Sequence, residues 1–282
     1  MSNYDPNAQA YGGYGYGQTA ALPQAQIDQG LRSYMVGVYN YMMIGLAITG
    51  FAALGIYMLS VTGDASLAAR GARGGALAVS AGQYLTPFGA FLFTSWFKFV
   101  VILAPLGVVM LLSFRADSMS APAAQMTFWL YAALVGVSMT TILLVYAHTS
   151  VARVFFITAA SFGALSLYGY TTKRDLSGMG TFLMMGLFGL IIASLVNIGI
   201  AAFTGQASTM LQWIISVVGV LIFAGLTAYD TQNIKNEYIY SLSYASDGSL
   251  IQKAAIFGAL QLYMDFVGMF QFLMSLLGSR NE

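Results

Sequence analysis

Two carboxylates within apolar segments are the residues of this sequence best placed to do chemistry. Asp265 lies inside the largely apolar run 254–277, and Asp230 closes the apolar segment before it. A carboxylate at the centre of a bilayer costs roughly 2.5–3.5 kcal/mol on insertion scales unless a partner, a proton or water relieves it. If the two meet in a low dielectric, both cannot stay ionised and they share a proton. Such a pair would be a pH switch that needs no histidine.

The composition places these carboxylates in a membrane protein. The chain has 282 residues, of which 58% are hydrophobic and only 7% are charged, against about 25% charged residues in an ordinary soluble domain. The net charge of +1 argues against a nucleic-acid partner, which needs clustered Lys and Arg. The sequence has no cysteine and one histidine, which excludes disulfides and thiolate metal sites and leaves little room for zinc chemistry.

Seven segments approach the roughly 20 apolar residues that a helix needs to cross a bilayer. They are residues 36–59, 97–114, 126–146, 154–170, 182–203, 211–230 and 254–277. We therefore expect an all-α polytopic membrane protein with seven transmembrane helices in one domain, residues 31–282. Residues 1–30, rich in Tyr and Gly, are predicted to be a disordered tail. The segments 71–75 and 121–124 are predicted to be loops.

The Lys and Arg residues between the spans give the expected orientation, since cytoplasmic loops carry the excess. Six lie on the side of the N-terminus and five on the opposite side. This bias of one residue favours a cytoplasmic N-terminus. The six are Arg32, Arg115, Lys173, Arg174, Lys235 and Lys253, and the five are Arg70, Arg73, Lys98, Arg153 and Arg280.

Small and polar residues form a stripe along each of the last two spans, which is typical of helix faces that pack against other helices. The stripe of the last span comprises Gly258, Gln261, Asp265, Gly268 and Ser275, and that of the sixth comprises Ser216, Gly219, Thr227 and Asp230. Both carboxylates therefore face inward, and Gln261, Thr227 and Ser216 are candidates to line a polar pore. Asp265 lies near the membrane midplane and Asp230 near a helix end, so they meet only if the last helix starts well outside the bilayer, or is tilted or broken.

Two further polar residues have simpler interpretations. His148, at the end of the third span, is expected to be an interfacial histidine rather than a ligand. Asn197, in the fifth span, is expected to hydrogen-bond between helices.

Four motifs together give the chain a family resemblance. Residues 228–235 (Ala-Tyr-Asp-Thr-Gln-Asn-Ile-Lys) and 262–270 (Leu-Tyr-Met-Asp-Phe-Val-Gly-Met-Phe) contain the two aspartates. Residues 172–178 (Thr-Lys-Arg-Asp-Leu-Ser-Gly) lie between the fourth and fifth spans, and 102–107 (Ile-Leu-Ala-Pro-Leu-Gly) lie in the second. In these motifs the sequence resembles the bacterial branch of the Bax inhibitor-1 (TMBIM) family, from about residue 31 to 277.

The resemblance implies a seven-helix bundle whose last helix is central, in the inner (plasma) membrane of a bacterium. It also implies a pH-sensitive calcium leak channel, with Asp230 and Asp265 as proton sensor and as transient calcium contacts. Arg115 matches the family's arginine that holds one aspartate in the closed state. Calcium would be the conducted ion, and no cofactor is expected. The sequence departs from some relatives in having Ala104 and Pro105 where they carry a carboxylate in the second span.

Two classes of intramembrane protease are alternatives to the channel. An intramembrane aspartyl protease would need Gly-x-Gly-Asp around its second aspartate, whereas Leu262 and Met264 occupy the glycine positions. A rhomboid protease would need a closing glycine after Ser138, which is absent. We therefore expect no enzyme activity. The alternative that stays open is a regulatory protein that binds and restrains other membrane proteins, such as a protease, without conducting ions. The expected partners are calcium ions, protons and the lipid bilayer.

Overall fold

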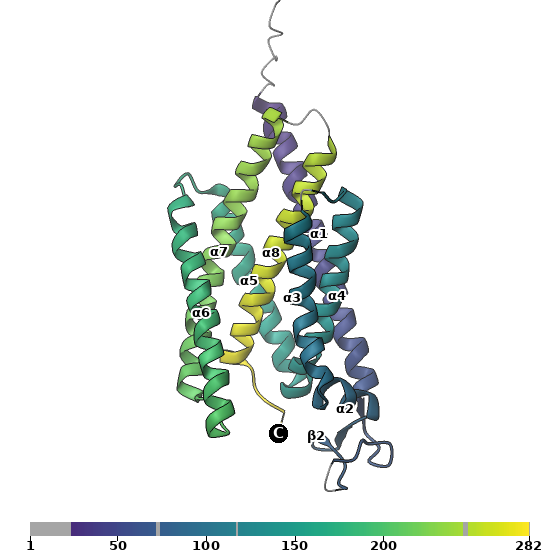
Figure 1. Ribbon diagram of the computed structural model, residues 1–282. Coiled ribbons are helices and arrows are strands. Elements are labelled where there is room, and N and C mark those ends of the chain that lie inside the picture. Colours follow the sequence, from purple (N-terminus) through teal and green to yellow (C-terminus); the bar gives the residue numbers. More distant parts are fainter. Residues whose placement is uncertain (1–23, 72–73, 117, 245–247, 282) are drawn as a thin grey trace, which may run out of the picture.

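The computed structural model describes residues 24–71, 74–116, 118–244 and 248–281, and this part of the chain is mainly helical (Figure 1). Seven of its helices are long and apolar enough to cross a membrane, which confirms the all-α polytopic fold. They are α1 (Gln24–Ser60), α3 (Phe97–Arg115), α4 (Ala121–Val145), α5 (His148–Thr171), α6 (Ser177–Thr204), α7 (Thr209–Tyr244) and α8 (Gly248–Leu277).

Several helix boundaries differ from the expected ones. Helices α5, α6 and α8 begin five or six residues before the predicted spans, and three other differences are larger or fall in a predicted tail or loop. Helix α1 starts at Gln24, so residues 24–30 are helical rather than part of a tail, and residues 1–23 lie outside the described residues. Helix α4 starts at Ala121, where a loop was predicted, because the Ser120 hydroxyl accepts a hydrogen bond from the Ala123 amide at 3.4 Å and a proline occupies the first turn. Serine caps and first-turn prolines both favour a helix start.

The third difference concerns α7, which does not end at Asp230 but continues to Tyr244. The apolar run ends at Asp230, whereas the helix goes on through residues that form helices well outside hydrocarbon. Apolar composition marks only the part of a helix that crosses hydrocarbon. The end predicted from it therefore lies fourteen residues before the end of the helix.

A small antiparallel sheet, which the sequence analysis did not predict, lies between α1 and the short helix α2 (Pro87–Thr94). It comprises β1 (Val61–Thr62), β2 (Ala78–Ser80) and β3 (Gln83–Leu85), in the order β1-β3-β2. Gly82 supplies the positive φ of +74° in the turn between β2 and β3. Strands of two or three residues are too short to show the alternation from which strands are predicted.

Helix α8 lies inside the bundle, as expected (Figure 1). It packs mainly against α7, α1, α5 and α4, whereas α3 lies outside on α4 and α6 lies outside on α7. Its residues Leu262 and Tyr263 are completely buried, and Met269 is 1% exposed. We call the end of the bundle where α1 begins and α7 meets α8 the N-terminal side, and the end where α1 and α8 finish the C-terminal side.

Candidate functional site

The hairpin of α7 and α8 brings the two predicted aspartates together. Asp230 lies fourteen residues before the end of α7, and Asp265 lies seventeen residues after the start of α8. At 1.5 Å per residue both are about 20–25 Å from the connection. The two aspartates therefore lie at the same depth, although the apolar segments placed Asp230 near a helix end and Asp265 near the midplane. Both helices extend well beyond the apolar segments on the N-terminal side.

The Asp230 and Asp265 side chains are buried and in hydrogen-bonding contact with each other. They are 4% and 3% exposed, and the Gln261 side chain, one turn before Asp265, also hydrogen-bonds to Asp230. A hydrogen bond between two carboxyl groups requires a proton on one of them. Within the described residues no donor reaches Oδ2 of Asp265, and a buried carboxylate oxygen left without a donor is costly. This geometry fits a pair that holds one proton.

A chain of hydroxyl groups runs beside Asp230 and connects three helices. The hydroxyl of Tyr39 on α1 lies 2.6 Å from that of Ser166 on α5, which in turn lies 2.8 Å from that of Thr231 on α7. Thr231 directly follows Asp230 in the chain and is completely buried. A second set of polar groups, adjacent to Asp230 in the chain, therefore connects α7 with α5 and α1.

The motif around Asp230 also fixes the segment between α5 and α6. The Gln232 side chain accepts a hydrogen bond from the Leu176 amide at 2.8 Å and donates one to the Arg174 carbonyl at 2.8 Å. The Lys235 ammonium group donates to the Tyr170 carbonyl at 3.0 Å. Two motifs that lie far apart in the sequence thus form one structural unit, and Lys235 is held at α5 rather than at the aspartates.

Arg115 does not reach the aspartate pair in this conformation. It is the last residue of α3, and its side chain is exposed. The hydrogen bonds described for the Asp230 side chain are with Asp265 and Gln261, and α3 packs mainly against α4. The expected Arg115–Asp230 ion pair is therefore absent from this conformation.

The three candidate pore residues occupy two different places. Gln261 contacts Asp230 directly, and Thr227, one turn before Asp230, is completely buried with its hydroxyl 2.7 Å from the Phe223 carbonyl. Ser216 lies fourteen residues before Asp230 on α7, about 21 Å along the helix. It therefore belongs to a separate polar cluster nearer the C-terminal side.

This second cluster joins α6, α7 and α8. The Ser216 hydroxyl donates to that of Ser275 at 2.9 Å, and the Gln212 amide reaches both hydroxyls at 3.4–3.5 Å. Asn197 donates to the Gln212 side chain at 3.1 Å and accepts a hydrogen bond from the Ser208 amide at 2.9 Å. Asn197 thus makes the interhelical bond that was expected. Gln212 is not among the residues predicted from the sequence, although it lies one turn before Ser216 and extends the polar stripe of α7.

An aromatic pair separates the two polar sites along the hairpin. The rings of Phe223 on α7 and Phe272 on α8 lie 5.9 Å apart. Each ring lies on a glycine of the opposite helix, Phe272 on Gly219 and Phe223 on Gly268, so closely that a Cβ atom on either glycine would clash with it. The small residues of the two predicted stripes therefore make room for two rings.

His148 lies at the start of α5 rather than at the end of α4. Its ring packs edge-on against Tyr57 of α1, with 5.0 Å between centroids. Within the described residues no group of three or more His, Asp or Glu side chains could hold a metal ion. The oxygens of Asp230, Asp265 and Gln261 fall short of the six to eight that calcium prefers, so any calcium contact here would be transient.

Comparison with known proteins identifies the family. A family model described as "Inhibitor of apoptosis-promoting Bax1" matches residues 31–282. The chain belongs to the Bax inhibitor-1 family. It is similar to the inner membrane protein YbhL of Escherichia coli K12, with 40% identity over 89% of this chain and 93% of that protein. It is also similar to uncharacterized proteins of Rickettsia prowazekii (40% identity, covering 94% and 97%) and Caulobacter vibrioides (38%, covering 96% and 98%).

Family membership and the seven apolar helices make this a multi-pass membrane protein. The name of the Escherichia coli relative supports a bacterial inner membrane as its location. The match begins at residue 31 and includes every transmembrane helix from α3 onward, as well as the aspartate pair.

Proposed function

We propose that this Bax inhibitor-1 family protein is a pH-sensitive calcium leak channel whose gate responds to the shared proton of Asp230 and Asp265. The observation that carries the proposal is the contact of two buried carboxyl groups, one on α7 and one on the central helix α8, with Oδ2 of Asp265 lacking a donor within the described residues. A buried acid pair of this kind is expensive in a membrane protein and is typical of proton relays and ion pathways.

The proton acts through the packing of α7 and α8. When the pair loses its proton, two negative charges lie in a low dielectric and repel each other unless water or a cation, here the Arg115 guanidinium group of the locked state, relieves them. Two titratable groups of this region are engaged elsewhere: Lys235 with the Tyr170 carbonyl, and Tyr39 with Ser166. The proton count of the pair therefore sets the local charge that a passing calcium ion meets.

The aromatic pair provides the barrier in this proposal. An ion would find polar neighbours at the aspartates and again at the cluster of Ser216, Gln212 and Ser275. Between these two sites, Phe223 and Phe272 fill the contact between α7 and α8, which we call the seam. Hydrophobic constrictions hold channels closed by excluding water. Conduction would require α7 and α8 to shift so that the two rings leave their glycines.

The proposal is tested by calcium entry into liposomes that contain only this protein. Entry that exceeds that of protein-free liposomes, and that changes with pH, would support a channel. The absence of flux under these conditions would favour the alternative, a protein that restrains other membrane proteins without conducting ions.

Arg115 gives a prediction about the closed state. We propose that α3 moves towards α7 when the closed state is locked, so that Arg115 pairs with the ionised Asp230, and that the conformation described above is closed by the two rings but not locked. Arg115→Ala should then raise the basal leak and make it less dependent on pH, because a charge-assisted bond that holds two helices is lost. Arg115→Lys, which keeps the charge, should retain part of the lock. A leak unchanged in Arg115→Ala would place the lock elsewhere.

The orientation gives a second prediction. We propose that the N-terminal side of the bundle, with the connection between α7 and α8, is cytoplasmic, because it carries six of the eleven Lys and Arg residues and cytoplasmic loops are enriched in them. A reporter fused after Arg280 should be active only when it functions outside the cytoplasm. Activity of a cytoplasmic reporter at this position would reverse the assignment.

A further inference from the structure

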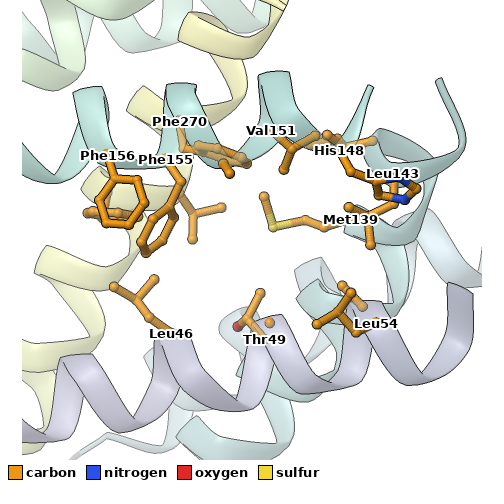
Figure 2. A pocket seen from close by; sticks show the side chains of 16 residues that line it. Leu46, Thr49, Leu54, Met139, Leu143, His148, Val151, Phe155, Phe156 and Phe270 are labelled. Atoms are coloured by element: carbon orange, nitrogen blue, oxygen red, sulfur yellow. The ribbon is translucent and has the colours of Figure 1, made fainter. Parts of the chain in front are cut away.

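A cavity of about 340 Å³ lies between α1, α4, α5 and α8 (Figure 2). Helices α4 and α5 are joined by only two residues, yet they contact each other far less than α1 contacts α4. The space that they leave is bounded by α1 on one side and reaches α8 at its inner wall, through Phe266 and Phe270. Phe156 on its rim is 70% exposed, so the cavity opens sideways to the surroundings of the helices.

The lining of the cavity is almost wholly apolar. Of its residues only Thr49 and His148 carry a polar side-chain atom. The Thr49 hydroxyl is already engaged, at 2.9 Å from the Ala132 carbonyl and 2.6 Å from the Tyr263 hydroxyl. The deep part of the cavity therefore has no free hydrogen-bonding group to offer, and a ligand that fits there must be hydrocarbon.

The cavity also has a defined direction. His148 is the first residue of α5, on the C-terminal side of the bundle, and Phe156 lies eight residues further along the same helix. At 1.5 Å per residue the lining runs about 12 Å inward along the helix. It therefore leads from the level of the headgroups into the hydrocarbon layer, with the single polar end at the membrane boundary, where His and Tyr side chains are well accommodated.

We propose that this cavity is a binding site for one acyl chain of a membrane phospholipid, with the headgroup at the level of His148. An acyl chain is already surrounded by hydrocarbon in the bilayer, so it gains no hydrophobic burial when it enters the cavity. Van der Waals packing in a space that the helices leave unfilled must therefore hold it. The rings of Phe155, Phe266 and Phe270 line the cavity and can supply such contacts. The Phe155 ring lies edge-to-face with the other two, with centroids 5.6 Å from Phe266 and 6.3 Å from Phe270, so the three form one continuous aromatic wall. The bound chain would touch α8 directly beside Asp265.

The site is tested with a phosphatidylglycerol that carries a photoreactive diazirine in the middle of one acyl chain. The full-length protein is placed in phosphatidylethanolamine–phosphatidylglycerol vesicles and irradiated, and the labelled residues are mapped by mass spectrometry. Labelling should concentrate on the cavity residues Met139, Phe155 and Phe270. Phe188 and Ile192 on α6, which are 62% and 61% exposed, report contact with bulk lipid. Equal labelling of the two sets would overturn the proposal.

Two glycines of α1 provide matched variants. Gly50 lines the cavity and Gly55 does not, and a Cβ atom on either meets nothing within 4 Å. Gly50→Phe should fill the cavity and reduce labelling of Met139 and Phe270 to the level of the α6 residues, whereas Gly55→Phe should leave it unchanged. Gly50→Leu is a smaller filling variant, and circular dichroism checks that each variant is folded. Undiminished labelling in folded Gly50→Phe would show that the label does not come from this cavity.

Discussion

Replacing Asp265 by Asn should abolish most of the pH dependence of calcium flux. Asparagine has nearly the same shape but cannot ionise, so the remaining carboxyl group has no second carboxylate with which to share a proton and no longer titrates as part of a pair. Asp230→Asn should have the same effect, because the proton belongs to both carboxyl groups. In the double variant the loss should be no greater than in either single variant, as is usual for groups that act as one unit. The measurement is the pH profile of calcium entry into proteoliposomes for the parent and the three variants.

The parent's leak should rise as the pH falls from alkaline values, because protonation weakens the proposed attraction of Asp230 for Arg115. At still lower pH the loss of negative charge should weaken the attraction for calcium, so a maximum is expected. Asp175→Asn is the control: its carboxylate lies in the exposed segment before α6, where hydrogen bonds from Ser177 hold its pKa below the ordinary value, and the pH profile should not change. Retention of the parent's pH dependence in both single variants, or independent addition of their effects, would exclude a shared-proton sensor.

Phe223→Ala and Phe272→Ala should each raise the leak at every pH. Each variant removes a ring from the seam between the two polar clusters and leaves the aspartates intact. If a packed ring contributes about 1.5–3 kcal/mol to the closed seam, the leak should increase about tenfold or more. Calcium flux at fixed pH measures the effect, and the retained pH dependence distinguishes these variants from those of the aspartates.

The control for the aromatic variants is Phe203→Ala, since Phe203 lies on α6, away from the contact between α7 and α8, and is 93% exposed. Thermal unfolding in detergent separates loss of the barrier from loss of the fold. If Phe223→Ala and Phe272→Ala lower stability but leave the flux at the parent's value, the two rings serve only to pack α7 against α8, and the barrier proposed here is wrong.

Much of the fold follows from the sequence because a bilayer imposes a simple requirement. A segment that crosses hydrocarbon must be apolar and helical, since every backbone group needs an internal partner. Apolar length alone therefore predicted seven helices, and the stripes of small and polar residues indicated correctly which faces of α7 and α8 point inward. The same stripes contained Gly219 and Gly268, and their packing against Phe272 and Phe223 confirms that these faces point inward.

The tertiary structure decided what lies outside hydrocarbon and how deep each group sits. The apolar pattern stops at Asp230 although α7 continues to Tyr244, so only the hairpin geometry showed that Asp230 and Asp265 lie at matching depths. Likewise the two hydrogen bonds between the Gln232 side chain and the backbone of the segment before α6 join residues far apart in the chain, and nothing in either motif alone specifies that contact.

In the candidate site, too, the sequence predicted some features and the tertiary structure decided others. Asp230, Asp265 and Gln261 were predictable because a polar side chain in an apolar helix is costly and so stands out. Ser216 shares their stripe, but its place in another cluster with Gln212 and Ser275 follows from distance along the helices. The separation of Arg115 from Asp230 depends on where α3 packs, which is decided by side-chain contacts between helices. Charge and hydropathy therefore determined which residues are candidates for the site, and packing alone determined which of them meet.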